Sequence, residues 1–242
     1  MKITMVVPTY NEVENLPKLV QDVLSLPLEN INILVVDDNS PDGTGELAEQ
    51  LGKQYNGRIK VMHRAGKLGL GTAYNQGFQM AIADGADAIG QMDADFSHPI
   101  DKIPSMMEAL ANYDFVIGSR YVKGGKLDEN WPFYRKWLSG FGNFYARTIL
   151  GLPIRDVTGG FKIWRRETLS AMPLDRIKAN GYMFQVEMNY VATRLGFQSF
   201  EIPIYFKERT YGASKMNFAI QKEAALRTWS LIGMYKDIKR VK

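Results

Sequence analysis

Residues 86–95 read ADAIGQMDAD, a mostly apolar run that ends in two aspartates one residue apart, Asp93 and Asp95. Along an extended segment, alternate side chains share a face, so both carboxylates can point at one spot. Two hard oxygen donors at one place suit a Mg²⁺ or Mn²⁺ ion that keeps open positions for phosphates. The same spacing is common in solvated acidic turns, so the pair predicts a metal site only together with other residues.

Strand-like and helix-like patterns alternate through the first half of the chain around this motif. We expect buried strands at residues 3–7, 31–36, 58–62, 86–92 and 115–118. Helices are expected at residues 16–24, 70–83 and 100–111, and another begins with Ser40 as its N-cap and Pro41 as its first helical residue. This alternation predicts an α/β domain with a mainly parallel sheet covered on both faces by helices. Asp93 and Asp95 would then lie at the carboxyl edge of the sheet, where ligands of such folds collect.

Composition narrows the class of protein. A chain of 242 residues with 45% hydrophobic and 23% charged residues is typical of one globular domain. It has no cysteine, which excludes disulfides, thiolate metal sites and a cysteine nucleophile, and is consistent with an intracellular protein. The net charge of +4 is too small to argue for nucleic acid but is compatible with phosphorylated ligands or an anionic membrane. We expect neither a secretory signal nor a membrane-spanning segment.

The second half contains an apolar stripe of unusual aromatic content at residues 131–152. Its members recur at helical spacing, namely Tyr134, Trp137, Leu138, Phe141, Phe144, Tyr145, Ile149 and Leu152. One interpretation is a helix packed on the sheet. The other is a face in the membrane interface, with Arg135, Lys136 and Arg147 at the headgroups. Residues 217–242 predict another amphipathic helix with a basic end.

Two other kinds of enzyme fit poorly. Gly66, Gly69 and Gly71 form a glycine-rich loop, but it does not follow the first strand as the dinucleotide-binding fingerprint does. The sequence lacks the G-x-S-x-G turn of a serine hydrolase, and only His63 and His98 could supply the catalytic histidine. His98 is best interpreted as a loop residue beside the aspartate pair, with a metal role as the lesser alternative.

Eight segments together resemble a known family. They are residues 8–12 (PTYNE), 36–44 (VDDNSPDGT), 67–74 (KLGLGTAY), 93–99 (DADFSHP), 118–121 (GSRY), 156–161 (DVTGGF), 181–187 (GYMFQVE) and 209–215 (RTYGASK). The set is similar to family 2 glycosyltransferases of the GT-A fold, and within them to dolichol-phosphate and bacterial polyprenol-phosphate mannose synthases. Many relatives continue into transmembrane helices, whereas this sequence stops at Lys242 and resembles the short type without them.

The resemblance implies roles for particular residues. The nucleoside pocket of the sugar donor would be formed by Pro8, Tyr10, Glu12, Val36 and Asp38. The divalent cation on the donor diphosphate would be held by Asp93, Ala94 and Asp95, with Ser97 as a further metal ligand, and the phosphates would be covered by Arg209 and Lys215. The acceptor phosphate would be clamped by Arg120, Arg135 and Ser139. Among these, the catalytic set would be Asp95, Arg120, Arg209 and Lys215.

The implied reaction moves mannose from GDP-mannose to a polyprenyl (dolichyl) phosphate with inversion, and needs Mg²⁺ or Mn²⁺. A phosphate monoester has its second pKa near ~6, so the acceptor is already a nucleophilic anion and needs no catalytic base. The alternatives are a UDP-glucose-dependent enzyme acting on the same lipid, and a non-catalytic binding subunit of the GT-A fold.

The expected organisation is one GT-A domain over residues 1–242. Residues 1–120 would form the nucleotide-sugar-binding half, and residues 121–242 the acceptor-binding and membrane-facing half. The protein would be cytoplasmic and peripherally associated with the cytoplasmic face of a membrane, with a small membrane-anchoring subunit as a further partner.

Overall fold

Strands and helices alternate through the structure, a computed structural model that describes residues 1–208 and 218–242, the side chains of 218–224 excepted. The strands are β1 (Ile3–Thr9), β2 (Ile31–Asp37), β3 (Ile59–His63), β4 (Ala88–Gln91), β5 (Phe115–Ser119), β6 (Lys126–Leu127), β7 (Lys162–Arg165), β8 (Ser199–Pro203) and β9 (Tyr205–Phe206). The α-helices are α1 (Leu16–Leu24), α2 (Thr44–Gln54), α3 (Leu70–Ala83), α4 (Ile103–Ala109), α5 (Phe133–Leu150), α6 (Arg166–Ala171), α7 (Tyr182–Leu195) and α8 (Phe218–Met234). Short 3₁₀ helices lie at Ile100–Lys102 and Leu174–Arg176.

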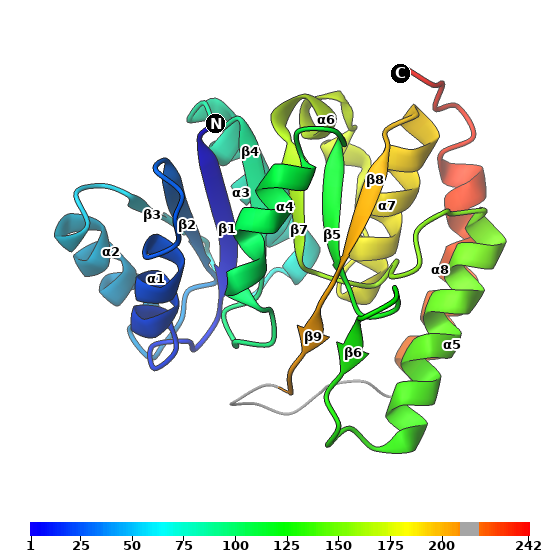
Figure 1. The fold of residues 1–242 in the computed structure, drawn as a ribbon, viewed down its shortest axis with the longest axis horizontal. Coiled ribbons are helices and arrows are strands. Elements are labelled where there is room, and N and C mark those ends of the chain that lie inside the picture. The colour runs from blue at the N-terminus through cyan, green and yellow to red at the C-terminus, as the bar shows by residue number, and fades with distance from the viewer. Residues whose placement is uncertain (209–217) are drawn as a thin grey trace.

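The main sheet has the order β3-β2-β1-β4-β7-β5-β8, and a small second sheet pairs β6 with β9 (Figure 1). Every neighbouring pair in the main sheet is parallel except those of β7, which runs antiparallel to both β4 and β5. The prediction of a mainly parallel sheet flanked by helices is confirmed. Because β7 inserts between β4 and β5, strands from both expected halves of the chain share one sheet.

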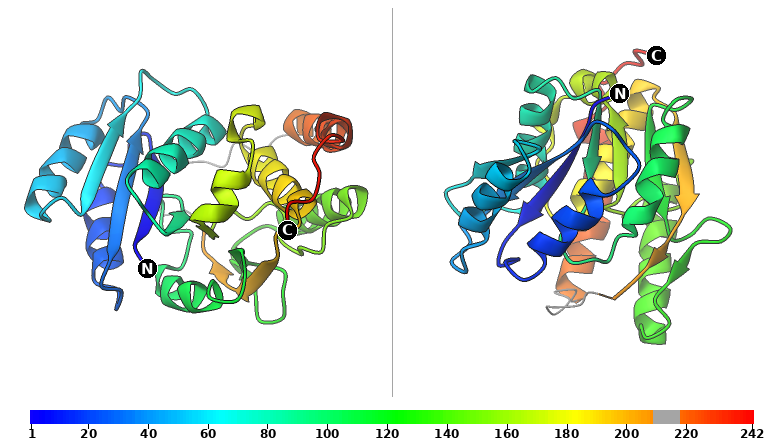
Figure 2. Two further views of the ribbon diagram at one scale, coloured as in Figure 1. Left: turned by 90° about the horizontal axis from the view of Figure 1, so that it is seen from above. Right: turned by 60° about the vertical axis from the view of Figure 1, so that its left-hand side comes forward.

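Both faces of the sheet are covered at its centre, so β1 and β2 carry apolar residues almost without interruption. In β1, Val6 belongs to the core cluster that includes residues of α3 and α7. Its neighbour Met5 belongs to the opposite cluster, which includes residues of α1, α2 and α4. Figure 2 shows the two layers of helices on either side of the strands. This packing aligns the carboxyl ends of β1, β2 and β4 along one edge, the lower one in Figure 1.

The start of α2 differs from the prediction at Ser40 and Pro41, which was wrong. The Ser40 amide and hydroxyl both donate to the Asp37 carboxylate, at 3.0 and 2.6 Å, and this closes a turn instead of opening a helix. Helix α2 begins only at Thr44, whose amide donates to Asp42 Oδ1 at 3.0 Å. Asp37 therefore uses its carboxylate to shape the loop beside the candidate site.

The segment around the aspartate pair is also not the extended strand that was expected. Strand β4 ends at Gln91, and Asp93 and Asp95 follow it in a bend. Phe96 has a φ of 59°, a left-handed conformation that is uncommon for a bulky side chain. A bend rather than the alternation of a strand therefore sets the directions of the two carboxylates.

Helices α5 and α8 pack side by side at the far end of the molecule (Figure 1). The aromatic part of the predicted stripe is not core, because Trp137 and Phe144 are 58% and 63% exposed, as is the neighbouring Phe133 at 82%. Only its last member, Leu152, is buried in the core. On α8, Leu226 and Trp229 are 66% and 56% exposed. We call these five exposed residues, together with Tyr134, Phe141 and Ile232, the α5–α8 apolar face. Among the described residues, the longest apolar helices still fall short of what a bilayer crossing requires.

The expected helix over residues 217–242 is shorter in the structure and ends at Met234. The guanidinium of Arg176 donates to the Met234 carbonyl oxygen at 2.7 Å and pairs with Asp237, which caps the helix end. The chain then returns to the body of the protein, where the Lys242 ammonium group pairs with Asp114. The basic end is therefore partly tied down rather than wholly solvated.

Candidate functional site

The first cluster of candidate residues lies where β1, β2 and β3 end. Asp38 follows β2 and accepts a 2.5 Å hydrogen bond from Arg64, which directly follows β3; both side chains are buried. Burial raises the pKa of the Asp38 carboxyl above its ordinary value, and Arg64 opposes this shift only in part. The carboxylate that was expected to bind a base is therefore held in place by a cation.

Arg64 is a residue that the sequence analysis missed. Its Nη2 donates to Thr72 Oγ1 at 2.5 Å, while its buried Nε has no hydrogen-bond partner within the described parts of the chain. A second missed cation, Lys67, lies 3.9 Å above the ring of Tyr10. The position of Arg64, immediately after a parallel strand, was the available signal, because ligands collect at such strand ends.

The other residues expected to bind the sugar donor differ in their burial and contacts. Register pairs Pro8 with Val36, so both lie at the edge where β1 and β2 end. Val36 is fully buried, so it does not present surface to a ligand in this structure. The Glu12 carboxylate accepts a 2.7 Å hydrogen bond from Asn15, and its amide donates to Thr44 Oγ1 at 2.9 Å. Through its amide, Glu12 thus also joins the loop after β1 to the start of α2.

Asp93 contacts the buried phenol of Tyr74, and the charge of Asp95 also acts on this phenol. The phenol donates to Asp93 Oδ1 at 3.2 Å. Burial, and then the charges of Asp93 and Asp95, hold the pKa of Tyr74 well above its ordinary value. The charges of both carboxylates thus act on the same phenol from a bend after β4, and their sharing of one metal ion stays a prediction.

The donor atoms around this pair fit a divalent cation. Asp95 Oδ1 accepts the amide of Ser97 at 3.1 Å, and the buried Ser97 hydroxyl has no hydrogen-bond partner in the part of the chain that the structure describes. Two carboxylates and a hydroxyl are the hard oxygen set that suits Mg²⁺ or Mn²⁺. Over residues 1–208 and 218–242, no group of three histidine, cysteine or acidic side chains is placed to hold a metal. A cation here would therefore need further ligands from a substrate or water.

His98 organises the loop of the aspartate pair, a role that the sequence analysis underestimated. Its Nδ1 accepts the amide of Asp93 at 3.1 Å, so a neutral ring carries its proton on Nε2. The buried ring stacks on Phe161 at 5.2 Å and meets the edge of Phe206 at 5.7 Å. These contacts hold the His98 ring in place, and through it the backbone of Asp93.

Arg120, expected to bind an acceptor phosphate, follows β5 and forms a buried ion pair with Asp156. Its Nε and Nη2 donate to the two carboxylate oxygens at 2.7 and 2.6 Å. Although burial disfavours the charge, Asp156 raises the pKa of the guanidinium above its ordinary value. Nη2 also donates to Thr158 Oγ1 at 2.8 Å, whereas Nη1 has no hydrogen-bond acceptor among the described residues. Asp156 is a further residue to which the sequence analysis assigned no role.

A chain of hydrogen bonds joins Ser139 to Arg120. The Ser139 hydroxyl accepts from the Tyr121 phenol at 2.7 Å, and its carbonyl oxygen accepts from Asn143 at 2.9 Å. The same Asn143 amide group donates to Thr158 at 3.0 Å, the residue that Arg120 contacts. Two of the three expected acceptor residues therefore belong to one polar network.

The third, Arg135, lies at the start of α5 on an aromatic support. Its guanidinium carbon is 3.6 Å from the centre of the Trp131 ring, and its Nη1 pairs with Glu208 at 2.7 Å. Trp131 meets Phe206 edge-on at 5.9 Å, and Arg120 lies 5.3 Å from the Phe206 ring centre. Since His98 also contacts Phe206, this ring connects both arginines to the loop of the aspartate pair.

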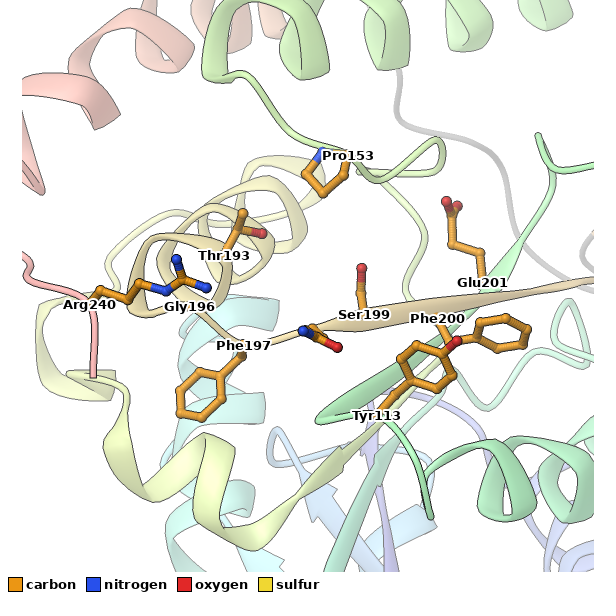
Figure 3. A pocket seen from close by; sticks show the side chains of 10 residues that line it. Tyr113, Pro153, Thr193, Gly196, Phe197, Ser199, Phe200, Glu201 and Arg240 are labelled. Carbon is orange, nitrogen blue, oxygen red and sulfur yellow. The ribbon is translucent and has the colours of Figure 1, made fainter. Parts of the chain in front are cut away.

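The two remaining expected residues, Arg209 and Lys215, lie outside the described residues. A groove of about 520 Å³ lies elsewhere, beside the amino ends of β5 and β8 (Figure 3). It is lined by residues such as Tyr113, Phe200 and Arg240 and contains none of the candidate residues. The candidate residues described above lie instead at the opposite, carboxyl ends of the strands.

Known proteins resemble this chain in sequence. Residues 4–172 match the model of the family described as glycosyl transferase family 2. An undecaprenyl-phosphate mannosyltransferase of Micrococcus luteus is 42% identical over 99% of this chain and 98% of its own length. A polyprenol monophosphomannose synthase of Mycolicibacterium smegmatis is also 42% identical, over 95% of this chain and 87% of its own.

A solved structure shows the same fold at low identity. It is a mannosyltransferase of Pyrobaculum calidifontis in complex with GDP-Man and Mn²⁺, with a TM-score of 0.64 and 16% identity. The match covers 99% of this chain and 65% of that protein. The predicted GT-A-like fold is thereby confirmed.

Proposed function

Because the chain belongs to glycosyl transferase family 2, we propose that it transfers mannose from GDP-mannose to a polyprenyl (dolichyl) phosphate, giving polyprenyl β-mannosyl phosphate and GDP. The observation that carries the proposal is the set of Asp93, Asp95 and the Ser97 hydroxyl, which has no hydrogen-bond partner among the described residues, beside the arginine-containing acceptor network. The names of the two relatives that are 42% identical support the sugar and the lipid acceptor.

On the donor side, the residues at the ends of β1 to β3 bind the nucleoside. Asp38 accepts base N–H groups, with Arg64 holding its carboxylate in place. The ring of Tyr10 offers a flat surface, and Pro8 and Glu12 line the same edge. Arg209 and Lys215, outside the described residues, complete the set by binding the diphosphate.

Mg²⁺ or Mn²⁺, held by Asp93, Asp95 and Ser97, would neutralise charge on the departing diphosphate. His98 keeps the backbone of Asp93 in position for this role. Ala94, which lies between the two aspartates, is buried, as is Asp95, whereas Asp93 is half-buried and is the more accessible of the two carboxylates.

On the acceptor side, Arg120, Arg135 and Ser139 bind the lipid phosphate. A guanidinium group matches phosphate oxygens with paired N–H donors. The phosphate oxygen attacks the anomeric carbon as the bond to the GDP oxygen breaks, so the configuration inverts from α to β. No side chain needs to accept a proton, because the nucleophile is already an anion near neutral pH. The residues contribute by bringing two anions together and holding them in line.

A polyprenyl phosphate lies in a membrane, so the protein must contact one to reach it. The α5–α8 apolar face is the surface that makes this contact. We propose peripheral association with the cytoplasmic face of a membrane, in which the exposed aromatic residues enter the interfacial region. A small membrane-anchoring subunit is a further proposed partner.

A binding screen tests the proposed donor. Thermal denaturation of the purified protein would be followed with GDP, UDP, GDP-mannose and UDP-glucose, each with and without Mn²⁺. We expect GDP-mannose with Mn²⁺ to stabilise the protein most, because a ligand that binds only the native state raises its melting temperature. Greater stabilisation by UDP-glucose would favour the alternative donor. No stabilisation by any nucleotide would favour a non-catalytic binding protein.

A further inference from the structure

Lys162, the first residue of β7, has a side chain without any exposed surface. Its ammonium nitrogen donates to the side-chain and main-chain oxygens of Gln185 on α7, at 2.7 and 3.5 Å. Across residues 1–208 and 218–242, it forms no ion pair with a carboxylate. Burying an ammonium group in this way is costly, and the proposed transfer does not use it. Its presence therefore requires an explanation.

The contacts of Lys162 lead toward the loop of the aspartate pair. The Gln185 side-chain oxygen also accepts from Gln91 at 2.8 Å, and the same Gln91 nitrogen donates to the Gly160 carbonyl oxygen at 2.9 Å. Gln91 is the last residue of β4, two positions before Asp93. A Cβ placed on Gly160 would lie 3.5 Å from His98. Lys162 thus belongs to a buried network that adjoins the candidate site.

Lys162 lies beside the strand that leads to the proposed acceptor subsite, because sheet register pairs it with Ile117 of β5, three residues before Arg120. From the neighbouring elements, Gln91 and Gln185 are neutral, whereas Asp156 attracts the ammonium charge and Arg120 repels it. Burial lowers the pKa of Lys162 to about 7, against the pull of Asp156 and with a smaller push from Arg120. Burial among neutral amides therefore makes the neutral form of this amine more accessible than it is for an exposed lysine.

We propose that Lys162 is a positioning residue for the acceptor, whose buried amine takes up a proton when a phosphate anion binds at the Arg120–Asp156 pair. The inference rests on the proposed acceptor role of Arg120. An anion arriving at Arg120 offsets the guanidinium charge that Lys162 feels, and it favours the ammonium form. One proton passes from the buffer to the Lys162 nitrogen, and no bond in the ligand changes. The added charge strengthens the hold on the phosphate and on Gln185.

Calorimetry can measure this proton. A short-chain isoprenyl phosphate would be titrated into the protein at pH 7.5 in two buffers of different ionisation enthalpy. If binding raises the pKa of Lys162 by about one unit, the wild type takes up about half a proton more than Lys162→Arg, whose charge is permanent. Any proton exchanged by the phosphate itself is common to both proteins and cancels in the comparison.

Three variants separate charge from hydrogen bonding. We expect Lys162→Gln, which can donate to Gln185 without a charge, to bind the isoprenyl phosphate about three- to tenfold more weakly, and Lys162→Arg to restore binding. GDP-mannose affinity should change little in either. Lys60→Met, which removes an exposed lysine on β3, is the matched control and should bind both ligands normally.

If a variant does not fold, the wild type still decides. NMR of protein with labelled lysine side chains would follow the pKa of Lys162 directly, with and without the isoprenyl phosphate, and should show it rise. Equal proton uptake in wild type and Lys162→Arg, or an unchanged pKa of Lys162 on binding, would overturn the inference while leaving the acceptor proposal intact. A wild type that binds no isoprenyl phosphate would instead refute the acceptor proposal, and the inference with it.

Discussion

Ser97 shows how much one side chain can indicate about chemistry. Its hydroxyl is buried without a hydrogen-bond partner among residues 1–208 and 218–242, next to two carboxylates that act on a common phenol. Leaving a buried hydroxyl unpaired costs about 1–3 kcal/mol, so a partner that arrives with the substrate is the economical explanation. A divalent cation bound to a diphosphate would be such a partner.

The first prediction concerns the aspartate pair. Asp95→Asn should nearly abolish turnover, because a neutral amide is a poor ligand for Mg²⁺ or Mn²⁺ and several kcal/mol of transition-state stabilisation are lost. Rates would be measured across a range of Mn²⁺ concentrations. The control is Asp101→Asn, which removes a nearby but highly exposed carboxylate and should leave turnover unchanged. Full activity of Asp95→Asn in excess chelator would contradict the metal site.

A second prediction separates the two subsites. Arg135→Ala should weaken binding of a phosphate lipid by about 1.5–3 kcal/mol, the value of one charge-assisted hydrogen bond, and leave GDP-mannose binding nearly unchanged. Arg209→Ala should do the reverse. Equilibrium titration of both ligands against both variants provides the measurement. Loss of donor affinity in Arg135→Ala, with lipid binding intact, would show that the subsites are assigned the wrong way round.

At the scale of elements, α5 and α8 present aromatic residues that the body of the protein does not cover. Trp137 stacks on Phe141 at 5.4 Å, and the Trp229 ring nitrogen donates to the Tyr145 phenol at 2.9 Å, so the two helices support each other's exposed rings. Indole and phenol groups are favoured at the boundary between headgroups and acyl chains. The α5–α8 apolar face thus has the composition of a membrane-contact surface.

The third prediction tests this surface. Replacing Trp137 and Trp229 together by Ser should reduce partitioning onto anionic vesicles, because each buried indole contributes roughly 1.5–3 kcal/mol. High salt should weaken binding further by screening the basic residues of α5. Vesicle sedimentation measures both effects. Phe200→Ser, at an exposed aromatic residue of β8 outside this face, is the control and should sediment like the wild type. Equal sedimentation of all three proteins would refute the membrane role.

Several elements could be predicted from local pattern, and the failures have physical causes. The buried strands β1 and β2 were found because both faces of a parallel sheet demand apolar residues. The start of α2 was misplaced because Ser40 bonds to Asp37 rather than to a helix end, and both arrangements use the same residue types. Strand β7 was not predicted at all, and its antiparallel direction depends on long-range pairing that no local pattern shows.

At the scale of the whole molecule, Lys162 makes a prediction about stability and pH. In the unfolded chain its pKa is about 10.5, whereas burial lowers the folded value to about 7. Between these values the unfolded state binds the extra proton, so stability rises with pH, by up to about 1.4 kcal/mol per unit from this group. Below pH 7 both states are protonated and the contribution is constant. Denaturant unfolding of the wild type from pH 6 to 9.5 should show this slope.

Lys162→Met provides the comparison for that slope. Without the titrating amine, the rise in stability above pH 7 should be smaller than in the wild type. The exposed-lysine variant Lys60→Met should retain the wild-type slope. Parallel stability curves for wild type and Lys162→Met would show that Lys162 is already charged when folded.

The candidate site was predictable where residues lie close together in sequence. Asp93, Asp95 and Ser97 could be found from one short segment. Arg64 and Asp156 were missed because their importance comes from pairing with Asp38 and Arg120 across 26 and 36 positions, which no local pattern reveals. Buried pairs of this kind are a product of the tertiary fold.

The most direct test of the central claim is a transfer assay with defined product. The purified protein would be incubated with GDP-mannose, a short polyprenyl phosphate and Mn²⁺, and the anomeric configuration of the lipid product determined by NMR. The proposed function predicts release of GDP and a β-linked mannosyl phosphate lipid, with no transfer by Asp95→Asn. An α-linked product, transfer only from UDP-glucose, or no transfer from any sugar nucleotide would contradict it.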